Sequence, residues 1–292
     1  MPDLVLHPDT IVAVQTVVRQ APHALLIIGA KGSGKASLAN LLSAEWLAVE
    51  SGALANYPYF KLVASADGIA AIRELQQFAS LKVPGPAGQR PVSRIAFIEA
   101  ADQLGDEAQN ALLKLLEEPP AGMVLLLSTE HERSMLPTIV SRTQSLVVKT
   151  PDPAELKAHF VSRGYEAATV DQVLNMVGGL PGLAEVLLSG DRNQLLFQAA
   201  EQARAILRHT TFERLLLVDG LSKQKELAGQ TVAMLIRMAE AALRQLATTA
   251  APEAAKRAEQ WQHIMSVAAV AQTKLQANVQ AKLALTDLML TL

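Results

Sequence analysis

A glycine-rich loop between an apolar run and a helical segment constrains the fold more than any other feature of the chain. The run Ala24–Ile28 has the length and composition of a buried parallel strand, and the loop Gly29–Lys35 follows it directly. Ser37–Glu50 then shows helical spacing. This order predicts a phosphate-binding loop, because loop N–H groups and a helix N-terminus point at phosphate oxygens. The alternative is a strand-to-helix turn without a ligand.

Further apolar runs alternate with helical segments over the following hundred residues. The runs predict strands at Tyr59–Val63, Arg94–Glu99, Val124–Ser128 and Leu146–Val148, and the helical spacings predict helices at Gly68–Leu81 and Asp106–Leu116. Strands that alternate with helices predict a mostly parallel sheet covered by helices on both faces. The first part of the chain is therefore expected to be an α/β domain.

Glycine and proline change in frequency along the chain. Residues 1–190 hold 14 of the 16 glycines and 13 of the 14 prolines, and the remaining sequence is rich in Ala, Leu and Gln. Two prolines also precede Glu155, where a new helix can begin. We therefore expect three parts, with bounds at 1–150, 151–192 and 193–292, of which the last is entirely helical.

Composition excludes several classes of protein. Half of the residues are hydrophobic and 18% are charged, which excludes a disordered chain. Cysteine is absent, so disulfides, thiolate metal sites and cysteine nucleophiles are excluded. The net charge of −2 requires neither a nucleic-acid nor a membrane partner, and no apolar run approaches the ~20 residues that span a bilayer. With no signal-like amino terminus, we expect a cytoplasmic protein without a membrane partner.

The expected nucleotide site lacks two side chains that metal-assisted hydrolysis needs. Ala36 stands where a hydroxyl normally binds Mg²⁺ after the loop lysine, and Ser37 is displaced by about 100° around the helix. Glu99 ends a strand and could take a metal-binding role, or it could be a solvated strand-end carboxylate. Ala100 cannot position a water. Phosphate binding through backbone amides and Lys35 is still possible, but ATP hydrolysis is not expected.

Four segments resemble the clamp-loader branch of the AAA+ proteins, and within it the delta-prime branch. They occur in the family's order at residues 22–47, 72–81, 94–120 and 125–144. The resemblance covers about residues 5–190, and it implies a P-loop AAA+ domain at 1–150 and a small helical lid at 151–192. Residues 193–292 match in length and helical character, which implies a helical collar for oligomerisation.

The resemblance also implies roles for single residues. Ser141–Thr143 is similar to the family's Ser-Arg-Cys motif, whose arginine projects toward the ATP of a neighbouring subunit. Arg142 is therefore expected to act as a finger in trans, and the alternative is an arginine paired with a carboxylate of its own chain. Thr129 stands at the sensor position, where a buried strand-end hydroxyl is the alternative. Gly182 stands where ATP-hydrolysing members carry a sensor arginine.

The function implied by the resemblance is that of a non-hydrolysing stator. Such a subunit completes the clamp-loader ring and supplies Arg142 to an adjacent ATPase subunit during sliding-clamp loading in DNA replication. Its expected partners are the ATPase subunits and the delta subunit of a heteropentamer, with the sliding clamp and primed DNA reached through the complex. Two alternatives stay open: an ATP-hydrolysing AAA+ motor subunit, and a stand-alone nucleotide-sensing module.

The expected cofactors follow from the same residues. No cofactor is required, and ATP or ADP binding is expected to be weakened. The degenerate nucleotide site comprises Gly29, Gly32, Ser33, Gly34, Lys35, Ser37, Glu99 and Thr129. The family usually carries a four-cysteine zinc module, but here Glu50–Asn56 is short and free of cysteine, so neither zinc nor another metal site is expected.

Overall fold

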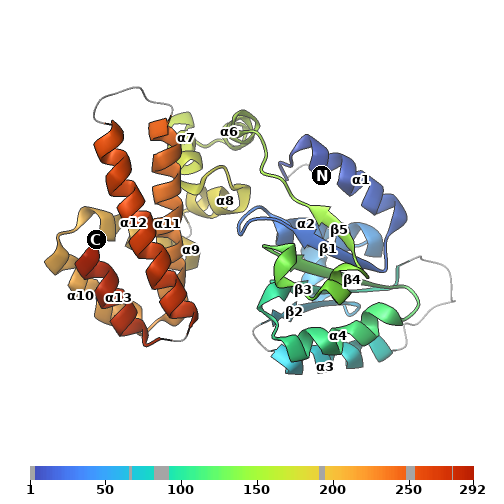
Figure 1. Ribbon diagram of the computed structural model, residues 1–292. Helices are drawn as coiled ribbons and strands as arrows, with labels where there is room; N and C mark the ends of the chain where they lie inside the picture. The colour runs from blue at the N-terminus through green and yellow to red at the C-terminus, as the bar shows by residue number, and fades with distance from the viewer. Residues whose placement is uncertain (1–3, 66–67, 82–91, 191–194, 248–253, 278) are drawn as a thin grey trace. The chain divides into compact units, whose positions relative to one another are not determined.

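The computed structural model describes residues 4–65, 68–81, 92–190, 195–247, 254–277 and 279–292 (Figure 1). The chain divides into two compact units, Met1–Pro151 and Asp152–Leu292. The division falls between the two prolines that precede the helix expected near Glu155. A further boundary near residue 192 stays a prediction.

The first unit is built on a five-stranded parallel sheet, counted over the described residues. Its strands are β1 (Ala24–Ile28), β2 (Phe60–Ala64), β3 (Arg94–Glu99), β4 (Met123–Thr129) and β5 (Gln144–Val147). They lie in the order β2-β3-β4-β1-β5, so the connection from β1 to β2 passes β4 and β3, and the connection from β4 to β5 passes β1. Because all neighbouring strands are parallel, their carboxyl ends meet at one edge of the sheet. The predicted α/β fold class is confirmed.

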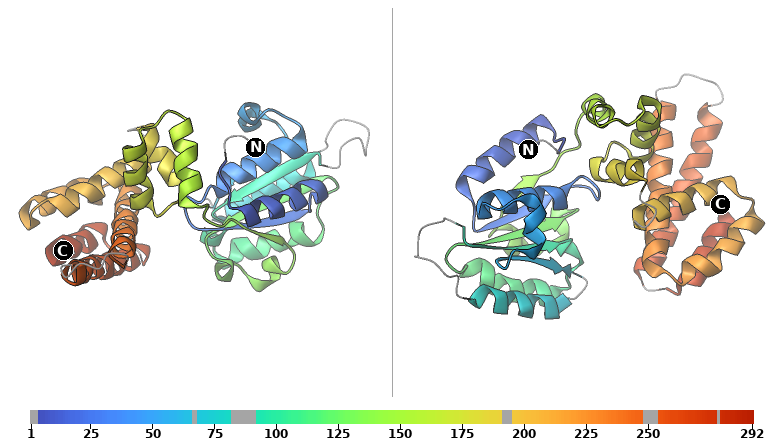
Figure 2. Two further views of the ribbon diagram at one scale, coloured as in Figure 1. Left: turned by 90° about the horizontal axis from the view of Figure 1, so that it is seen from above. Right: turned by 180° about the vertical axis from the view of Figure 1, so that it is seen from behind.

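Helices cover both faces of this sheet (Figures 1 and 2). The described helices of the first unit are α1 (Pro8–Gln20), α2 (Lys35–Leu47), α3 (Gly68–Ser80), α4 (Asp106–Glu117) and the short α5 (Pro137–Val140), together with the 3-10 helices η1 (Ser51–Asn56), η3 (Ala101–Gln103) and η4 (Glu132–Ser134). Helices α1 and α2 pack on one face, and α3 and α4 pack on the other. The connection from α2 to β2, where the zinc module is expected to be deleted, contains η1.

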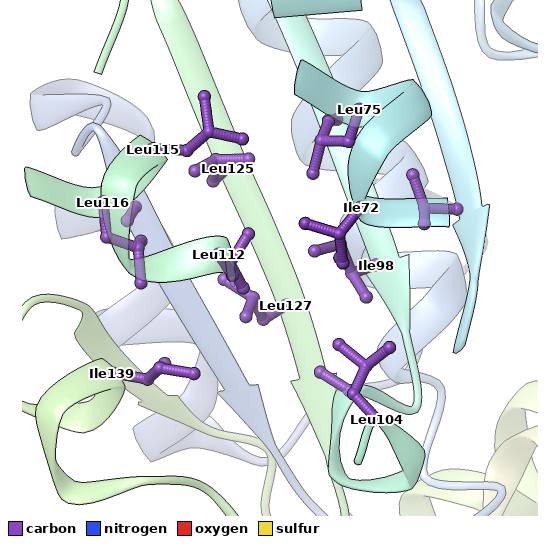
Figure 3. Close-up of a cluster of buried hydrophobic side chains, with 14 of the residues drawn as sticks. Ile72, Leu75, Ile98, Leu104, Leu112, Leu115, Leu116, Leu125, Leu127 and Ile139 are labelled. Carbon is purple, nitrogen blue, oxygen red and sulfur yellow. The ribbon is translucent and has the colours of Figure 1, made fainter. Parts of the chain in front are cut away.

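Two apolar clusters hold the helices to the sheet. On the α3/α4 face, Ile72 and Leu112 are fully buried with Leu125 and Leu127 of β4 (Figure 3). On the α1/α2 face, residues such as Leu25 are equally buried. Each buried side chain of this size contributes about 1.5–3 kcal/mol relative to an exposed one. The continuous apolar strands that sequence patterning predicts are therefore explained by burial on both faces.

The second unit is helical throughout its described residues. Its helices are α6 (Pro153–Ser162), α7 (Ala167–Val177), α8 (Pro181–Ser189), α9 (Leu195–Arg208), α10 (Thr211–Ser222), α11 (Lys225–Ala247), α12 (Ala254–Gln276) and α13 (Ala281–Thr291). A single cluster rich in alanine, leucine and methionine joins α9 to α13. Among the described residues, none of the helices has the length and apolar character that crossing a bilayer requires.

One prediction about surface charge is wrong. The sequence favours solvated surface positions for Lys31, Lys82, Arg90 and Arg94, but Arg94 is buried at 7% exposure. Its Nη1 donates to the carbonyls of Phe78 and Ala79 at 3.2 and 2.5 Å, so it caps the last turn of α3. Residues 82 and 90 lie outside the described residues.

Candidate functional site

The glycine loop connects β1 to α2 at the carboxyl edge of the sheet. Gly32 and Gly34 take left-handed φ values of +85° and +91°, which glycine adopts without strain. At Gly29 a Cβ would lie 2.8 Å from the Ser33 hydroxyl and 3.0 Å from the Val148 carbonyl. The loop therefore depends on glycine both for its turn and for its close approach to the chain beyond β5.

Lys35 folds back onto this loop. Its Nζ donates to the carbonyls of Gly29 and Ala30 at 2.6 and 3.0 Å. These two bonds keep the ammonium at the mouth of the loop, where the outer phosphates of a nucleotide would lie in a phosphate-binding loop.

Burial lowers the pKa of Lys35 below the usual lysine value, and nearby carboxylates oppose that change. The carboxylates are, in decreasing order of effect, Glu130, Asp102 and Glu99. Carboxylates of the same chain thus favour the charged form of this lysine, whereas burial and the neighbouring Lys31 oppose it.

The residues present fit a phosphate group better than a phosphate with its metal. Ser33 Oγ is buried and has no hydrogen-bond partner among the described residues, so a ligand oxygen could satisfy it. Ala36 packs against the core and offers no oxygen, and the side chain of Ser37 is exposed. A nucleotide bound here would be held by loop amides and Lys35, while the hydroxyl ligand for Mg²⁺ is missing.

Glu99 and Thr129 lie at the same edge as the loop, at the ends of β3 and β4. Glu99 is exposed, as in the solvated alternative. Thr129 is fully buried, and its hydroxyl donates to the His131 carbonyl at 2.9 Å and accepts the His131 amide at 3.2 Å. The threonine hydroxyl is therefore already hydrogen-bonded within its own loop. Through its backbone, the Thr129 carbonyl accepts the amide of Gly29 at 3.1 Å, which joins the end of β4 to the glycine loop.

Asp102 is expected from sequence to cap a helix or to form a pair. Its Oδ1 is buried and has no hydrogen-bond partner within the described part of the chain. The neighbouring Ala100 has φ +51° and donates its amide to Ser128 Oγ at 3.0 Å. Ala100 is thus fixed in a strained left-handed conformation where a water-positioning carboxylate would be needed.

Arg142 follows α5 and lies apart from the glycine loop. Its Nη2 is 2.8 Å from Glu117 Oε1, and its Nη1 donates to the Thr138 carbonyl at 3.1 Å. The in-chain pairing that sequence reasoning left open as an alternative is therefore present. The Arg142 side chain is nevertheless 38% exposed, and it lines an open groove of about 810 Å³ together with His23.

The glycine loop and Arg142 lie at opposite ends of the parallel strands: the loop follows the carboxyl end of β1, and Arg142 precedes the amino end of β5. In the parallel pair of β1 and β5, Leu25 is opposite Gln144. Arg142 precedes Gln144 by two residues, whereas Gly29 follows Leu25 by four. Four residues of strand span about 13 Å, so the guanidinium does not face the loop of its own chain.

Several known proteins are similar to this chain. The family described as "DNA polymerase III, delta subunit" matches residues 12–152. The DNA polymerase III delta' subunit of Bacillus subtilis is 29% identical over 56% of this chain and 53% of its own length. That of Escherichia coli is 35% identical over 35% of this chain and 31% of its own length.

Residues 12–152 match this family, and the chain is similar to delta-prime subunits of DNA polymerase III.

The similarity of the chain to these relatives has limits. The chain covers about half the length of the Bacillus relative, and less than two thirds of each of the others. A gamma/tau subunit from Mycobacterium tuberculosis is 28% identical over 68% of this chain and 36% of its own length. A gamma subunit-related protein from Thermotoga maritima has a TM-score of 0.53 at 19% identity, covering 96% of this chain and 97% of that one, and it shows the fold alone.

Gln109 is a site-supporting residue that sequence reasoning missed. It lies on α4 at 3% exposure. Its Nε2 donates to the Leu104 carbonyl at 3.0 Å, and its Oε1 accepts the Leu136 amide at 2.9 Å. The glutamine therefore anchors the segment that leads into α5 and Arg142. A buried glutamine on an otherwise apolar helix face was the available signal.

The predicted lid residue Gly182 lies in the first turn of α8, in the second unit. The segment before it contains two glycines with positive φ, Gly178 and Gly179. Gly178 ends α7 in a left-handed conformation, as helix-terminating glycines commonly do. Because glycine has no side chain, residue 182 cannot contact a phosphate group as a sensor arginine would.

Proposed function

We propose that this chain is a clamp-loader subunit that does not hydrolyse ATP and instead supplies Arg142 to the nucleotide site of an adjacent ATPase subunit. In this role it is a stator that completes the ring during loading of a sliding clamp onto primed DNA. The observation that carries the proposal is the position of Arg142. The guanidinium lies in an open groove near the amino ends of β1 and β5, whereas its own glycine loop follows the carboxyl end of β1.

Three departures in its own nucleotide site support the absence of hydrolysis. Ala36 lacks the hydroxyl that binds Mg²⁺, and Ala100 lacks the carboxylate that positions the attacking water. Gly182 takes the place of a sensor arginine in the resemblance on which the proposal builds. Each absence removes a different part of the machinery, so restoring one of them would not restore turnover.

The nucleotide site keeps a role in binding within this proposal. The glycine loop, Lys35 and the orphaned Ser33 hydroxyl suit ATP or ADP without a required metal. The bound phosphate would be held by backbone amides and one ammonium, so its affinity is weakened relative to a loop that also binds Mg²⁺. The partners are the ATPase and delta subunits of a heteropentamer in the cytoplasm, and neither zinc nor another metal is part of the site.

The test is ATP turnover by the assembled loader carrying Arg142→Ala in this subunit alone. Arginine fingers contribute about 10³–10⁵ to the rate in other phosphoryl-transfer systems. We therefore expect turnover at the adjacent site to disappear while the ring still assembles. The matched control is Arg133→Ala, since Arg133 is an exposed arginine of the nearby η4 and should leave turnover unchanged. Unchanged clamp loading by Arg142→Ala would contradict the proposal.

A further inference from the structure

Arg142 already has an anionic partner in its own chain. Glu117 is the last residue of α4, and its Oε1 lies 2.8 Å from Arg142 Nη2. Nη1 is occupied as well, because it donates to the Thr138 carbonyl at 3.1 Å and lies 3.4 Å from Ser141 Oγ. Both terminal nitrogens of the guanidinium are therefore engaged before any phosphate arrives.

Glu117 occupies the kind of position that a phosphate oxygen would take. Carboxylate and phosphate oxygens bind guanidinium groups in the same planar geometry, at distances near 2.8 Å. A phosphate entering the groove would also be repelled by the carboxylate, because the two negative charges would share one guanidinium. A phosphate can therefore engage Arg142 fully only when Glu117 moves away.

The ion pair is built so that it can exchange. The side chains of Arg142 and Glu117 are 38% and 51% exposed, and exposed pairs of this kind contribute little to stability. A γ-phosphate carries more charge than a carboxylate and can bind an arginine bidentately. The competition therefore favours the phosphate when it is present and Glu117 when it is absent.

We propose that Glu117 competes with the γ-phosphate of a neighbouring subunit's ATP for Arg142, and so makes the arginine responsive to that phosphate. The inference rests on the proposed function, in which Arg142 faces the neighbour. Before ATP binds, Glu117 holds the guanidinium within its own chain. After the γ-phosphate is cleaved and released, Glu117 binds the guanidinium again and the contact between subunits weakens.

The experiment compares Glu117→Gln with Glu118→Gln in the assembled loader, with the other ATPase sites inactivated. Glutamine keeps the shape of the side chain and removes its charge. Glu118 is the matched control, since it is exposed, adjacent in sequence and in no ion pair among the described residues. A non-hydrolysable ATP analogue is expected to bind about two- to five-fold more tightly with Glu117→Gln, the range set by an exposed pair. ADP affinity and kcat should stay unchanged.

Three results would overturn this inference: unchanged analogue affinity, the same change in Glu118→Gln, or a fall in kcat with Glu117→Gln. The last would make Glu117 a group that positions Arg142 for catalysis rather than a competitor. The double variant Glu117→Gln with Arg142→Ala separates this inference from the proposed function. If Arg142→Ala alone abolishes turnover, the proposed function stands; an affinity gain from Glu117→Gln that persists without Arg142 would then refute the competition alone.

Discussion

Replacing Gln109 by leucine tests whether α4 fixes the segment that presents Arg142. The glutamine side chain joins the Leu104 carbonyl and the Leu136 amide, at 3.0 and 2.9 Å. Leucine has a similar volume and fills the site without these bonds. The substitution therefore leaves one backbone acceptor and one backbone donor without their side-chain partner, while packing is largely retained.

The magnitude follows from the burial of these two groups. A buried donor or acceptor left unsatisfied costs about 1–3 kcal/mol, and the two together predict a loss of about 2–6 kcal/mol. For a unit of this size, 1 kcal/mol lowers Tm by roughly 2–4 °C, so the expected decrease is about 4–24 °C. Asn110→Ala is the control, because its exposed side chain bonds only to the Asp106 carbonyl of its own helix.

The assay follows the first unit by tryptophan fluorescence during thermal or urea unfolding. The chain has two tryptophans, and only Trp46 lies in the first unit, where its Nε1 donates to the Val18 carbonyl. A Trp261→Phe background therefore isolates the signal. A transition in Gln109→Leu within 0.5 kcal/mol of the Asn110→Ala control, the usual range for surface substitutions, would refute the reasoning.

Two other substitutions test parts of the fold. Arg94→Met removes the buried cap of α3 and is expected to cost about 1–3 kcal/mol in urea unfolding, whereas Arg73→Met on the exposed face of α3 should cost less than about 0.5 kcal/mol. Equal effects would show that Arg94 contributes only as a surface residue. Thr210→Ala removes the capping box at the start of α10 and should destabilise the second unit by about 1 kcal/mol, measured through Trp261 in a Trp46→Phe background. An unchanged midpoint would contradict the role of the cap.

The central strands could be predicted closely because burial on both faces leaves an apolar run between turn residues. Ala24–Ile28 and Arg94–Glu99 have the predicted bounds, and the strand predicted at Val124–Ser128 is longer by one residue at each end. The edge strand β5 was predicted less well. It begins at Gln144, whereas it was predicted to begin at Leu146. Its first two residues are polar and exposed, so no apolar run marks where it begins.

Helix bounds depended on local conformation that residue patterns describe poorly. The helix expected over Ser37–Glu50 begins at Lys35 and ends at Leu47, where Ala48 adopts φ +52°. No helix or strand was predicted before Ala24, although α1 begins at Pro8. The proline in its first turn and the buried Val14 and Val17 were the available signals.

The site was predictable where a motif carries it and not where distant residues meet. The glycine loop between β1 and α2 and the arginine after α5 could be located from sequence, and the roles assigned to them stay predictions. The Arg142 partner Glu117 and the anchor Gln109 were not predicted, because their contacts join segments 25 and 27 residues apart. Such pairs are set by the packing of α4 beside α5, which a single sequence does not specify.

A non-hydrolysing subunit that lends Arg142 to a neighbour is tested most directly by ATP turnover, measured on the purified chain and then after mixing with the partner ATPase subunits. We expect no Mg²⁺-dependent turnover by the chain alone, and a stimulation of the mixture that Arg142→Ala abolishes. Turnover by the isolated chain, or equal stimulation by the wild-type chain and Arg142→Ala, would contradict this role.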